Sequence, residues 1–275
     1  MAAEDAIFAD TMAEMTWNEA EAAASGGAIA LWGFGVIEQH GPHLPVGTDV
    51  YLPSARLRRV RKLLAERGIT SIIVPPFYWG VNGVSASYPA SFVVRPEIMV
   101  ELMLDVFKSL ARDGFRKVFC VTGHGEALHN TTIYKGIQKG VAETGLNISF
   151  AAEEGLFSRL KIDLADTCVT PFSTPKDPNV TMPDIHAGMG ETSQMLALYP
   201  SLVKQTKLAD LDPVAFTVAD LAEWRQGYDV SRRKTPLGYV GNPAKAQAET
   251  GAKDFEIGAI AMADAIAARV AAAPR

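Results

Sequence analysis

The stretch Gly35-Val-Ile-Glu-Gln-His-Gly-Pro-His-Leu-Pro-Val-Gly-Thr-Asp49 follows an apolar run, residues 28–32, that is typical of a buried strand. Its glycines and prolines interrupt regular structure while Glu38, His40 and Asp49 arrive close together. Glu38 and His40 are two residues apart, so in extended backbone both side chains leave the same face. Carboxylate, imidazole and carboxylate make a ligand set that suits Zn²⁺ or Mn²⁺. Taken alone, the stretch fits a polar loop with solvated carboxylates equally well.

Outward from this stretch, apolar runs alternate with amphipathic helical patterns through the first half of the chain. The expected strands are residues 28–32, 70–75, 117–122 and 147–151. The expected helices are residues 10–24, 49–65, 96–114 and 129–145. This alternation predicts an α/β fold with a mostly parallel central sheet and helices on both of its faces. The apolar, β-branched strands agree with burial on both sides.

The second half of the chain is less regular. Residues 167–183 contain several prolines, which predicts a long loop or lid. Prolines also mark an expected boundary in the first half, where the strand at 70–75 should stop at Pro75-Pro76. Further helices are expected at residues 191–198, 214–226 and 255–273, with a turn-rich link at 238–243. The length of 275 residues accommodates one large α/β domain or two small ones.

Composition excludes several classes of function. The net charge is -5 and no basic block is present, which argues against a nucleic-acid partner. No apolar run approaches the length of a membrane span, and the first residues lack the pattern of a signal peptide. Two cysteines, Cys120 and Cys168, do not make a disulfide framework. We therefore expect a cytoplasmic protein in which Cys120, inside an apolar strand, is a packing residue and not a nucleophile.

Two further polar patches follow the first. Thr122-Gly-His-Gly-Glu126 comes directly after a strand, at the carboxyl edge of the expected sheet, where open α/β sheets place their ligands. It repeats the spacing of histidine and carboxylate two residues apart. Asp184-Ile-His-Ala-Gly-Met-Gly-Glu191 joins a loop to the start of a helix. Three such patches in one chain favour a metal site over a solvated loop.

All five histidines lie in or near these patches. His40 and His124, each two residues from a carboxylate, are predicted to be metal ligands. His43 and His129 are expected to support the ligands or cap helices. His186 fits a loop histidine as well as a catalytic one. The turn at residues 33–35 lacks the third glycine and the following helix of a dinucleotide-binding fingerprint, so that class is rejected.

Together these motifs resemble the creatininase (creatinine amidohydrolase) family over nearly the whole chain. The matching segments are Glu38-Gln-His-Gly-Pro-His-Leu-Pro45, Gly47-Thr-Asp49, Gly123-His-Gly-Glu126, His186-Ala-Gly188 with Glu191-Thr-Ser193, and Gly238-Tyr-Val-Gly-Asn-Pro243. The resemblance implies a three-layer α/β/α fold in one hydrolase domain, residues 1–275. It also implies a two-metal site with Zn²⁺ and/or Mn²⁺, a small-molecule substrate and a homo-oligomer, often a hexamer.

The resemblance further implies a role for each site residue. Its two ligand sets share a bridging aspartate: Glu38, Asp49 and His124 for one ion, and His40, Asp49 and Glu126 for the other. His186 and Glu126 would be the catalytic residues, with His186 transferring a proton to the departing nitrogen. Glu191 would support the site, or bind a metal in relatives without a carboxylate at the Glu126 position. Two adjacent ions can lower the pKa of a shared water, and a loop histidine has a suitable pKa for proton transfer.

Departures from the family pattern bear on the substrate. Creatininase itself carries an aromatic residue where this chain has Gly125, and a tryptophan where it has Pro183, beside Asp184. We therefore expect hydrolysis of an amide or cyclic amide other than creatinine, such as a lactam, imide, hydantoin or formamide, in a pocket formed by Trp79, Tyr88 and Asp184. Two alternatives stay open: a dinuclear-metal hydrolase of a non-amide bond, such as a cyclic polyol ketone, and a non-catalytic metal-binding homologue.

Overall fold

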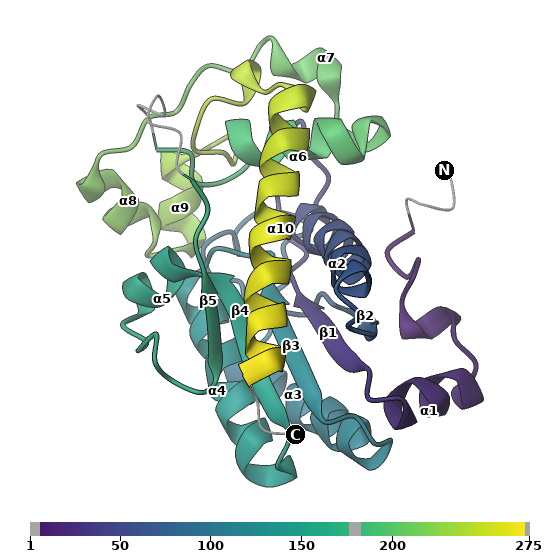
Figure 1. Ribbon diagram of the computed structural model, residues 1–275. Coiled ribbons are helices and arrows are strands. Elements are labelled where there is room, and N and C mark those ends of the chain that lie inside the picture. The colour runs from purple at the N-terminus through teal and green to yellow at the C-terminus, as the bar shows by residue number, and fades with distance from the viewer. Residues whose placement is uncertain (1–5, 176–182, 273–275) are drawn as a thin grey trace.

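The computed structural model, which describes residues 6–175 and 183–272, is built around a five-stranded sheet in the order β2-β1-β3-β4-β5 (Figure 1). Each neighbouring pair of strands is parallel. The strands are β1 (Ile29–Phe34), β2 (Ser71–Phe77), β3 (Lys117–Thr122), β4 (Asn147–Glu153) and β5 (Val169–Phe172). The parallel sheet expected from the alternating pattern is confirmed.

Helices cover both faces of the sheet and give three layers, as expected (Figure 1). One face carries α2 (Thr48–Glu66) and α10 (Ala248–Ala272), and the other carries α3 (Pro96–Arg112) and α4 (Ala127–Thr144). Successive residues of β1 enter two different cores: Leu31 packs with α2 and α10, whereas Trp32 packs with α3 and α4. Because both faces are buried, the strands are mostly apolar.

Shorter elements complete the chain, most of them beyond the carboxyl ends of the strands in Figure 1. The helices are α1 (Trp17–Ser25), α5 (Glu154–Leu160), α6 (Met189–Leu198), α7 (Gln205–Leu208), α8 (Val218–Trp224) and α9 (Tyr228–Lys234). The 3₁₀ turns are Met12–Glu14, Pro200–Leu202 and Pro243–Lys245. The patterns at residues 10–24 and 214–226 predicted longer helices than those present, and α5, α7 and α9 were not predicted.

Two strand expectations were wrong, and both concern the edges of the sheet. Strand β2 does not stop at Pro75 but continues to Phe77, and the loop expected at 167–183 begins with β5, which contains Pro171. An edge strand bonds to a neighbour on one side only, so a proline can be placed where its missing N–H costs nothing. The pairing of β1 with β2 also shifts register between Trp32 and Phe34. Residues 176–182 of the expected loop and residue 273 of the expected last helix lie outside the described residues.

The strand order reverses between β1 and β3, since β2 lies on the far side of β1. The connections that leave these two strands therefore lead to opposite faces, α2 on one and α4 on the other, and a crevice opens between them. Residues 35–49 follow β1 and residues 123–126 follow β3. The fold thus brings the first two polar patches to one crevice.

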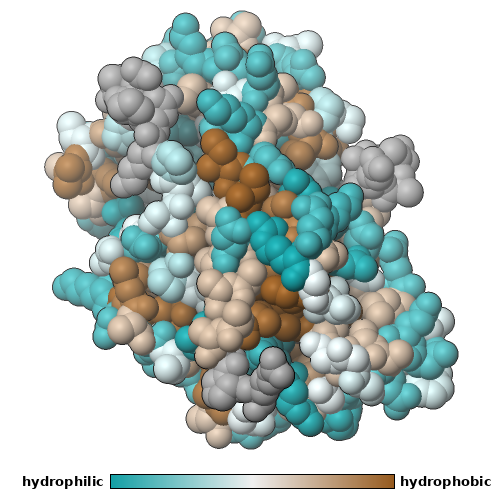
Figure 2. Space-filling view, in the orientation of Figure 1, coloured by the Kyte–Doolittle hydropathy of each residue, from teal (hydrophilic) through white to brown (hydrophobic). Residues whose placement is uncertain are grey.

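Within the described residues, no helix is both long and apolar enough to cross a lipid bilayer. Figure 2 shows the face that carries α10, where hydrophilic and hydrophobic residues are mixed.

Candidate metal centre

Asp49 lies at the centre of the crevice, in the first turn of α2, where a carboxylate is favoured by the helix dipole. Its side chain is buried, with 2% of its surface exposed. One carboxylate oxygen, Oδ1, is 3.2 Å from His40 Nε2, and the other, Oδ2, is 2.9 Å from His124 Nδ1. Asp49 therefore presents one oxygen to the segment after β1 and one to the segment after β3.

Two glycines allow the ends of β1 and β3 to close around Asp49. A Cβ atom on Gly35 would lie 2.1 Å from the Asp49 carbonyl oxygen, and one on Gly123 would lie 2.3 Å from the same atom. Both distances are far below van der Waals contact, so any side chain at either position would push α2 away from the strand ends. These glycines are needed for close approach of backbone to backbone.

The first group of candidate ligands is Glu38, Asp49 and His124, whose ligand atoms lie within 4.8 Å of one another. Glu38 Oε1 is 3.0 Å from His124 Nδ1, and Ser85 Oγ donates a hydrogen bond of 2.6 Å to Glu38 Oε2. Glu38 Oε1 is buried and has no hydrogen-bond partner among the described residues. A buried carboxylate oxygen needs a donor or a positive charge beside it, and a cation bound between Glu38 and His124 would supply that charge.

The second group is His40, Asp49 and Glu191. His40 Nδ1 lies 3.1 Å from the Glu38 carbonyl oxygen, so its N–H can donate there while Nε2 is left for Asp49 or an ion. Glu191, in the first turn of α6, has Oε2 4.0 Å from His40 Nε2 and accepts a hydrogen bond of 2.5 Å from the Ala187 amide. The two groups share Asp49, which is the arrangement a bridging carboxylate requires.

Glu126 lies differently from the ligand position expected for it. Its Oε2 accepts hydrogen bonds from the amides of Gly83 and Val84, at 2.8 and 3.0 Å, and is 3.7 Å from His124 Nε2. It belongs to neither group described above, because its backbone is extended immediately before α4 and its side chain turns to the loop after β2. Its role as a ligand stays a prediction.

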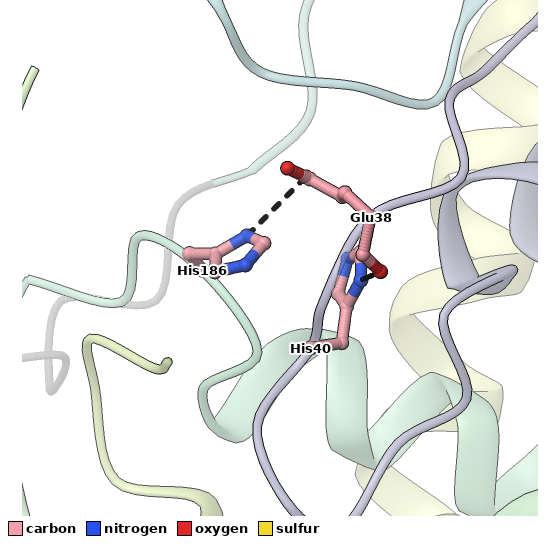
Figure 3. A group of neighbouring side chains, drawn as sticks. All are labelled: Glu38, His40 and His186. Atoms are coloured by element: carbon pink, nitrogen blue, oxygen red, sulfur yellow. Dashed lines mark hydrogen bonds and ion pairs between the residues drawn. The ribbon is translucent and has the colours of Figure 1, made fainter. Parts of the chain in front are cut away.

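His186 faces this centre from a separate loop, and with Glu38 and His40 it makes a third group whose ligand atoms lie within 4.8 Å of one another (Figure 3). Its Nδ1 is 3.7 Å from Glu38 Oε1, and its ring centroid is 4.5 Å from that of His40. Its Nε2 is 2.9 Å from the Gln39 carbonyl oxygen, so an N–H there can donate and leave Nδ1 facing the carboxylates. Backbone hydrogen bonds with Val240 hold the loop in place.

The electrostatics of the centre favour bound positive charge. Burial lowers the pKa of His40, but the carboxylates of Asp49, Glu191 and Glu38 together outweigh burial and raise the pKa to about 10. Burial opposes charge on His124 too, and Glu38 and Asp49 nonetheless hold its pKa well above the usual value. The buried carboxylates thus draw protons onto the imidazoles in the absence of cations. Divalent ions bound by these residues would take over that role.

The two remaining histidines are buried away from the ligand groups. His43 Nε2 is 2.9 Å from Thr192 Oγ1, and burial lowers the pKa of His43 to about 4. Burial also holds the pKa of His129 well below its usual value, and its ring packs edge-on against that of His124. These contacts agree with the expectation that His43 and His129 hold neighbouring residues in place. Cys120 is buried, and burial raises the pKa of its thiol, as befits a packing residue.

A cavity of about 750 Å³ opens onto the centre. Asp184 lines it as expected, although its carboxylate also binds the Met189 and Gly190 amides that begin α6. Trp79 and Tyr88 are not among the residues that line this cavity. Trp79 stacks on Phe92 at the surface and Tyr88 Oη bonds to Thr235, so the expected aromatic wall is not formed by them. Ser85, which the sequence did not single out, contacts Glu38 from the Gly- and Ser-rich segment after β2.

The fold and the centre define a class: an α/β protein with a buried cluster of carboxylates and imidazoles at the switch point of a parallel sheet. Within that class, the family model for creatinine amidohydrolase matches residues 13–266. The chain therefore belongs to the creatininase family of metal-dependent hydrolases.

Relatives of known activity differ in their reactions. The chain is 29% identical over 270 residues to creatinine amidohydrolase of Pseudomonas putida, covering 92% of this chain and 94% of the relative. It is 28% identical over 230 residues to the mycofactocin precursor peptide peptidase of Mycobacterium ulcerans, covering 80% and 77%. It is 26% identical over 189 residues to the 3-dehydro-scyllo-inosose hydrolase of Thermotoga maritima, covering 66% and 54%.

Solved structures of creatininase share the fold. A crystal structure of creatinine amidohydrolase aligns with a TM-score of 0.73 at 26% identity, over 94% of this chain and 97% of that one. A manganese form of creatininase aligns with a TM-score of 0.70 at 25% identity, over 96% and 99%. A zinc–zinc form of a creatininase mutant aligns with a TM-score of 0.70 at 26% identity, over 93% and 96%.

Proposed function

We propose that this protein is a metal-dependent amidohydrolase of one domain, residues 1–275, that hydrolyses an amide or cyclic amide at a dinuclear centre. The observation that carries the proposal is the position of Asp49, whose two oxygens each face a different group of candidate ligands. We assign Glu38, Asp49 and His124 to one ion, and His40, Asp49 and Glu191 to the other. Glu126 is the alternative ligand for the second ion.

Zn²⁺ or Mn²⁺ in this centre would supply an activated water at neutral pH and polarise the carbonyl of the substrate. Glu126 accepts the proton of the attacking water, because two backbone amides fix its Oε2 and hold the carboxylate at the edge of the centre. For the next step His186 must carry a proton on both ring nitrogens: the Nε2 N–H is held by the Gln39 carbonyl, and the Nδ1 N–H, which faces the centre, gives its proton to the departing nitrogen. His186 is left neutral, and the proton that Glu126 took from the water keeps the proton count balanced. The buried surroundings of Glu38, His40 and Asp49 keep bulk water from competing with the substrate.

A second function has specific support in the inosose hydrolase relative, whose substrate is a cyclic polyol ketone. The same ligands would serve a carbon–carbon bond in such a ring, with the proton from His186 going to the departing carbon instead of to nitrogen. The peptidase relative keeps open a peptide substrate, which is also an amide. A turnover screen over lactams, imides, hydantoins, formamides, short peptides and cyclic polyol ketones, run beside metal analysis of the same preparation, distinguishes these substrates. Turnover of ketones alone would reject amide hydrolysis.

The His186→Gln variant tests the mechanism. Glutamine keeps a hydrogen bond but cannot titrate, so kcat should fall by roughly 10²–10⁴-fold, the usual range for loss of a general acid or base. Metal content should stay at the wild-type level. Amides with good leaving groups need little protonation and should be affected much less. Loss of an ion, or equal damage to activated and ordinary amides, would contradict the role given to His186.

We also propose that the protein works in the cytoplasm as a homo-oligomer, with a hexamer as the expected assembly. An exposed aromatic pair supports an interface: the rings of Trp79 and Phe92 lie 5.7 Å apart, and 45% and 47% of their surfaces are exposed. Val93, next in the chain, is equally exposed. Apolar side chains gathered in this way are typical of a surface that another subunit covers.

A further inference from the structure

Three arginines line the cavity above the metal centre: Arg95, Arg159 and Arg225. Arg95 has a carboxylate partner, since its Nη1 lies 3.4 Å from Glu97 Oε1. In the described parts of the chain, neither Arg159 nor Arg225 forms an ion pair. Two guanidinium groups at one cavity therefore have no carboxylate within ion-pair distance among the described residues.

Arg159 is held directly beside the metal-binding segment. It comes from the last turn of α5, and its Nη2 donates a hydrogen bond of 2.7 Å to the carbonyl oxygen of Gly125. Gly125 lies between His124 and Glu126 in the chain, so this bond places the guanidinium beside the backbone of the segment that carries both. The rest of the guanidinium fork has no partner in the described structure and is available to a ligand.

Arg225 reaches the same cavity from the end of α8. Partial burial lowers the pKa of Arg159, and the positive charge of Arg225 lowers it further, which shows that the two charges lie close enough to repel. Arginine stays protonated at every physiological pH, so an anion bound between the two guanidinium groups would relieve this repulsion. Helices α5 and α8 lie on the same side of the molecule in Figure 1.

Space for such an anion exists above Gly125. A Cβ atom added to this glycine would meet nothing within 4 Å, and the residue is exposed. A bulky side chain here would fill the region between the metal centre and Arg159. Its absence leaves the cavity open from the candidate ligands to the arginines.

We propose that the substrate carries a carboxylate that binds to Arg159 and Arg225 while its scissile bond lies at the metal centre. A planar carboxylate matches the guanidinium fork and forms the strong, charge-assisted hydrogen bonds that an uncharged group cannot. Resting on the proposed amidohydrolase function, this inference narrows the substrate to acidic amides, such as a carboxyl-bearing hydantoin or an N-acyl amino acid. Creatinine, which has no carboxylate, would leave the arginines unpaired.

Matched pairs of acid and amide test the proposal with the zinc-loaded protein. One pair is hydantoin-5-acetate and hydantoin-5-acetamide, and a second is N-formyl-β-alanine and its primary amide. Binding is measured by calorimetry and turnover by product release. We expect the acids to bind at least tenfold more tightly than the amides. Arg225→Gln and Arg159→Gln should each weaken acid binding by roughly 10–100-fold, the range for losing charge-assisted hydrogen bonds, and leave amide binding within about twofold.

Two further variants separate the arginine contacts from charge in general. Arg225→Lys keeps the charge without the fork and should recover part of the affinity for the acids. Arg112→Gln removes the same charge from the surface end of α3, where Arg112 pairs with Asp113, and should change nothing. Because Arg159 and Arg225 are exposed, their replacement should leave the free energy of unfolding near the wild-type value.

The outcomes are distinguishable. Equal binding of acid and amide, or acid binding that the Arg159 and Arg225 variants do not weaken, would overturn this inference even if both compounds were hydrolysed, and the amidohydrolase function would stand. Arginine-dependent binding of the acids without hydrolysis of any amide would support the inference and count against the amidohydrolase function. Hydrolysis of the acids with a raised KM in the arginine variants would support both.

Discussion

Asp49 is the residue on which the candidate metal centre depends. It is buried, it begins α2, and each of its oxygens lies near a different imidazole. His40 and His124 each belong to one of the ligand groups centred on Asp49, whereas Asp49 belongs to both of them. Removal of the shared carboxylate should therefore affect both ions.

The Asp49→Ala variant is predicted to lose most of both ions, while His40→Ala and His124→Ala each lose about one. The reason is that a bridging carboxylate serves two sites and each imidazole serves one. Elemental analysis of the purified variants, after dialysis under identical conditions, measures this directly. Equal and small losses in the three variants would contradict a bridged centre.

His43 should make stability depend on pH. Its pKa is about 4 in the folded protein because the ring is buried, and about 6.5 when unfolded. Below pH 6.5 the imidazole of His43 binds a proton in the unfolded chain, whereas in the folded chain it binds one only near pH 4. As the pH is lowered from about 6.5 to about 4, the contribution of His43 to the free energy of unfolding should fall by about 1.4 kcal/mol per pH unit.

Urea denaturation between pH 4 and pH 7, in the wild type and in His43→Gln, tests this linkage. The variant lacks the titrating group, so its stability should decline less steeply as the pH falls. Other titrating groups, including His129, contribute to both proteins and cancel in the comparison. Parallel pH profiles would show that His43 is not held neutral by the fold.

At the scale of elements, the site depends on how closely β1, β3 and α2 approach one another. The segments after β1 and β3 carry ligands, and α2 carries the aspartate between them. Gly35 and Gly123 permit the contact, because a Cβ on either would overlap the Asp49 carbonyl oxygen. Backbone atoms cannot rotate away as a flexible side chain can, so the packing here tolerates no enlargement.

Gly123→Ala is therefore predicted to destabilise the protein by about 1–3 kcal/mol, the usual cost of forcing extra volume into a packed region, and to weaken metal binding. Gly125→Ala is the matched control two residues away, because its new methyl group would meet open space. Urea denaturation and metal titration of the two variants provide the comparison. Similar behaviour of both variants would show that the close approach at Gly123 is not required.

At the scale of the whole molecule, the exposed aromatic pair Trp79 and Phe92 predicts subunit contact. Phe92→Glu places a charge in this patch and should shift the protein to smaller species in size-exclusion chromatography with light scattering. Trp17→Glu is a matched control, because Trp17 is 79% exposed on α1, in a different part of the chain. An unchanged mass in Phe92→Glu would place the interface elsewhere or show that the protein is a monomer.

The central architecture followed from local patterns in the sequence. Strands β1, β3 and β4 are mostly apolar because both faces are buried, and the helices that follow them carry amphipathic repeats. Each of these elements is therefore specified by its own residues. The three polar patches were visible for a similar reason, since histidine and carboxylate recur there at short spacing. Edge strands were harder to detect, because Pro75 and Pro171 carry a loop signal that one-sided pairing tolerates.

Tertiary structure alone decided which groups meet in the crevice. His40 and Glu191 are far apart in the chain, and their approach depends on how α6 packs beyond the sheet. Glu126 is two residues from His124, yet hydrogen bonds to the amides of Gly83 and Val84 turn it toward another loop. Arg159 and Arg225 likewise line one cavity although they come from segments far apart in the chain. Local sequence determines what an element is, whereas side-chain chemistry between elements depends on packing contacts that no short pattern encodes.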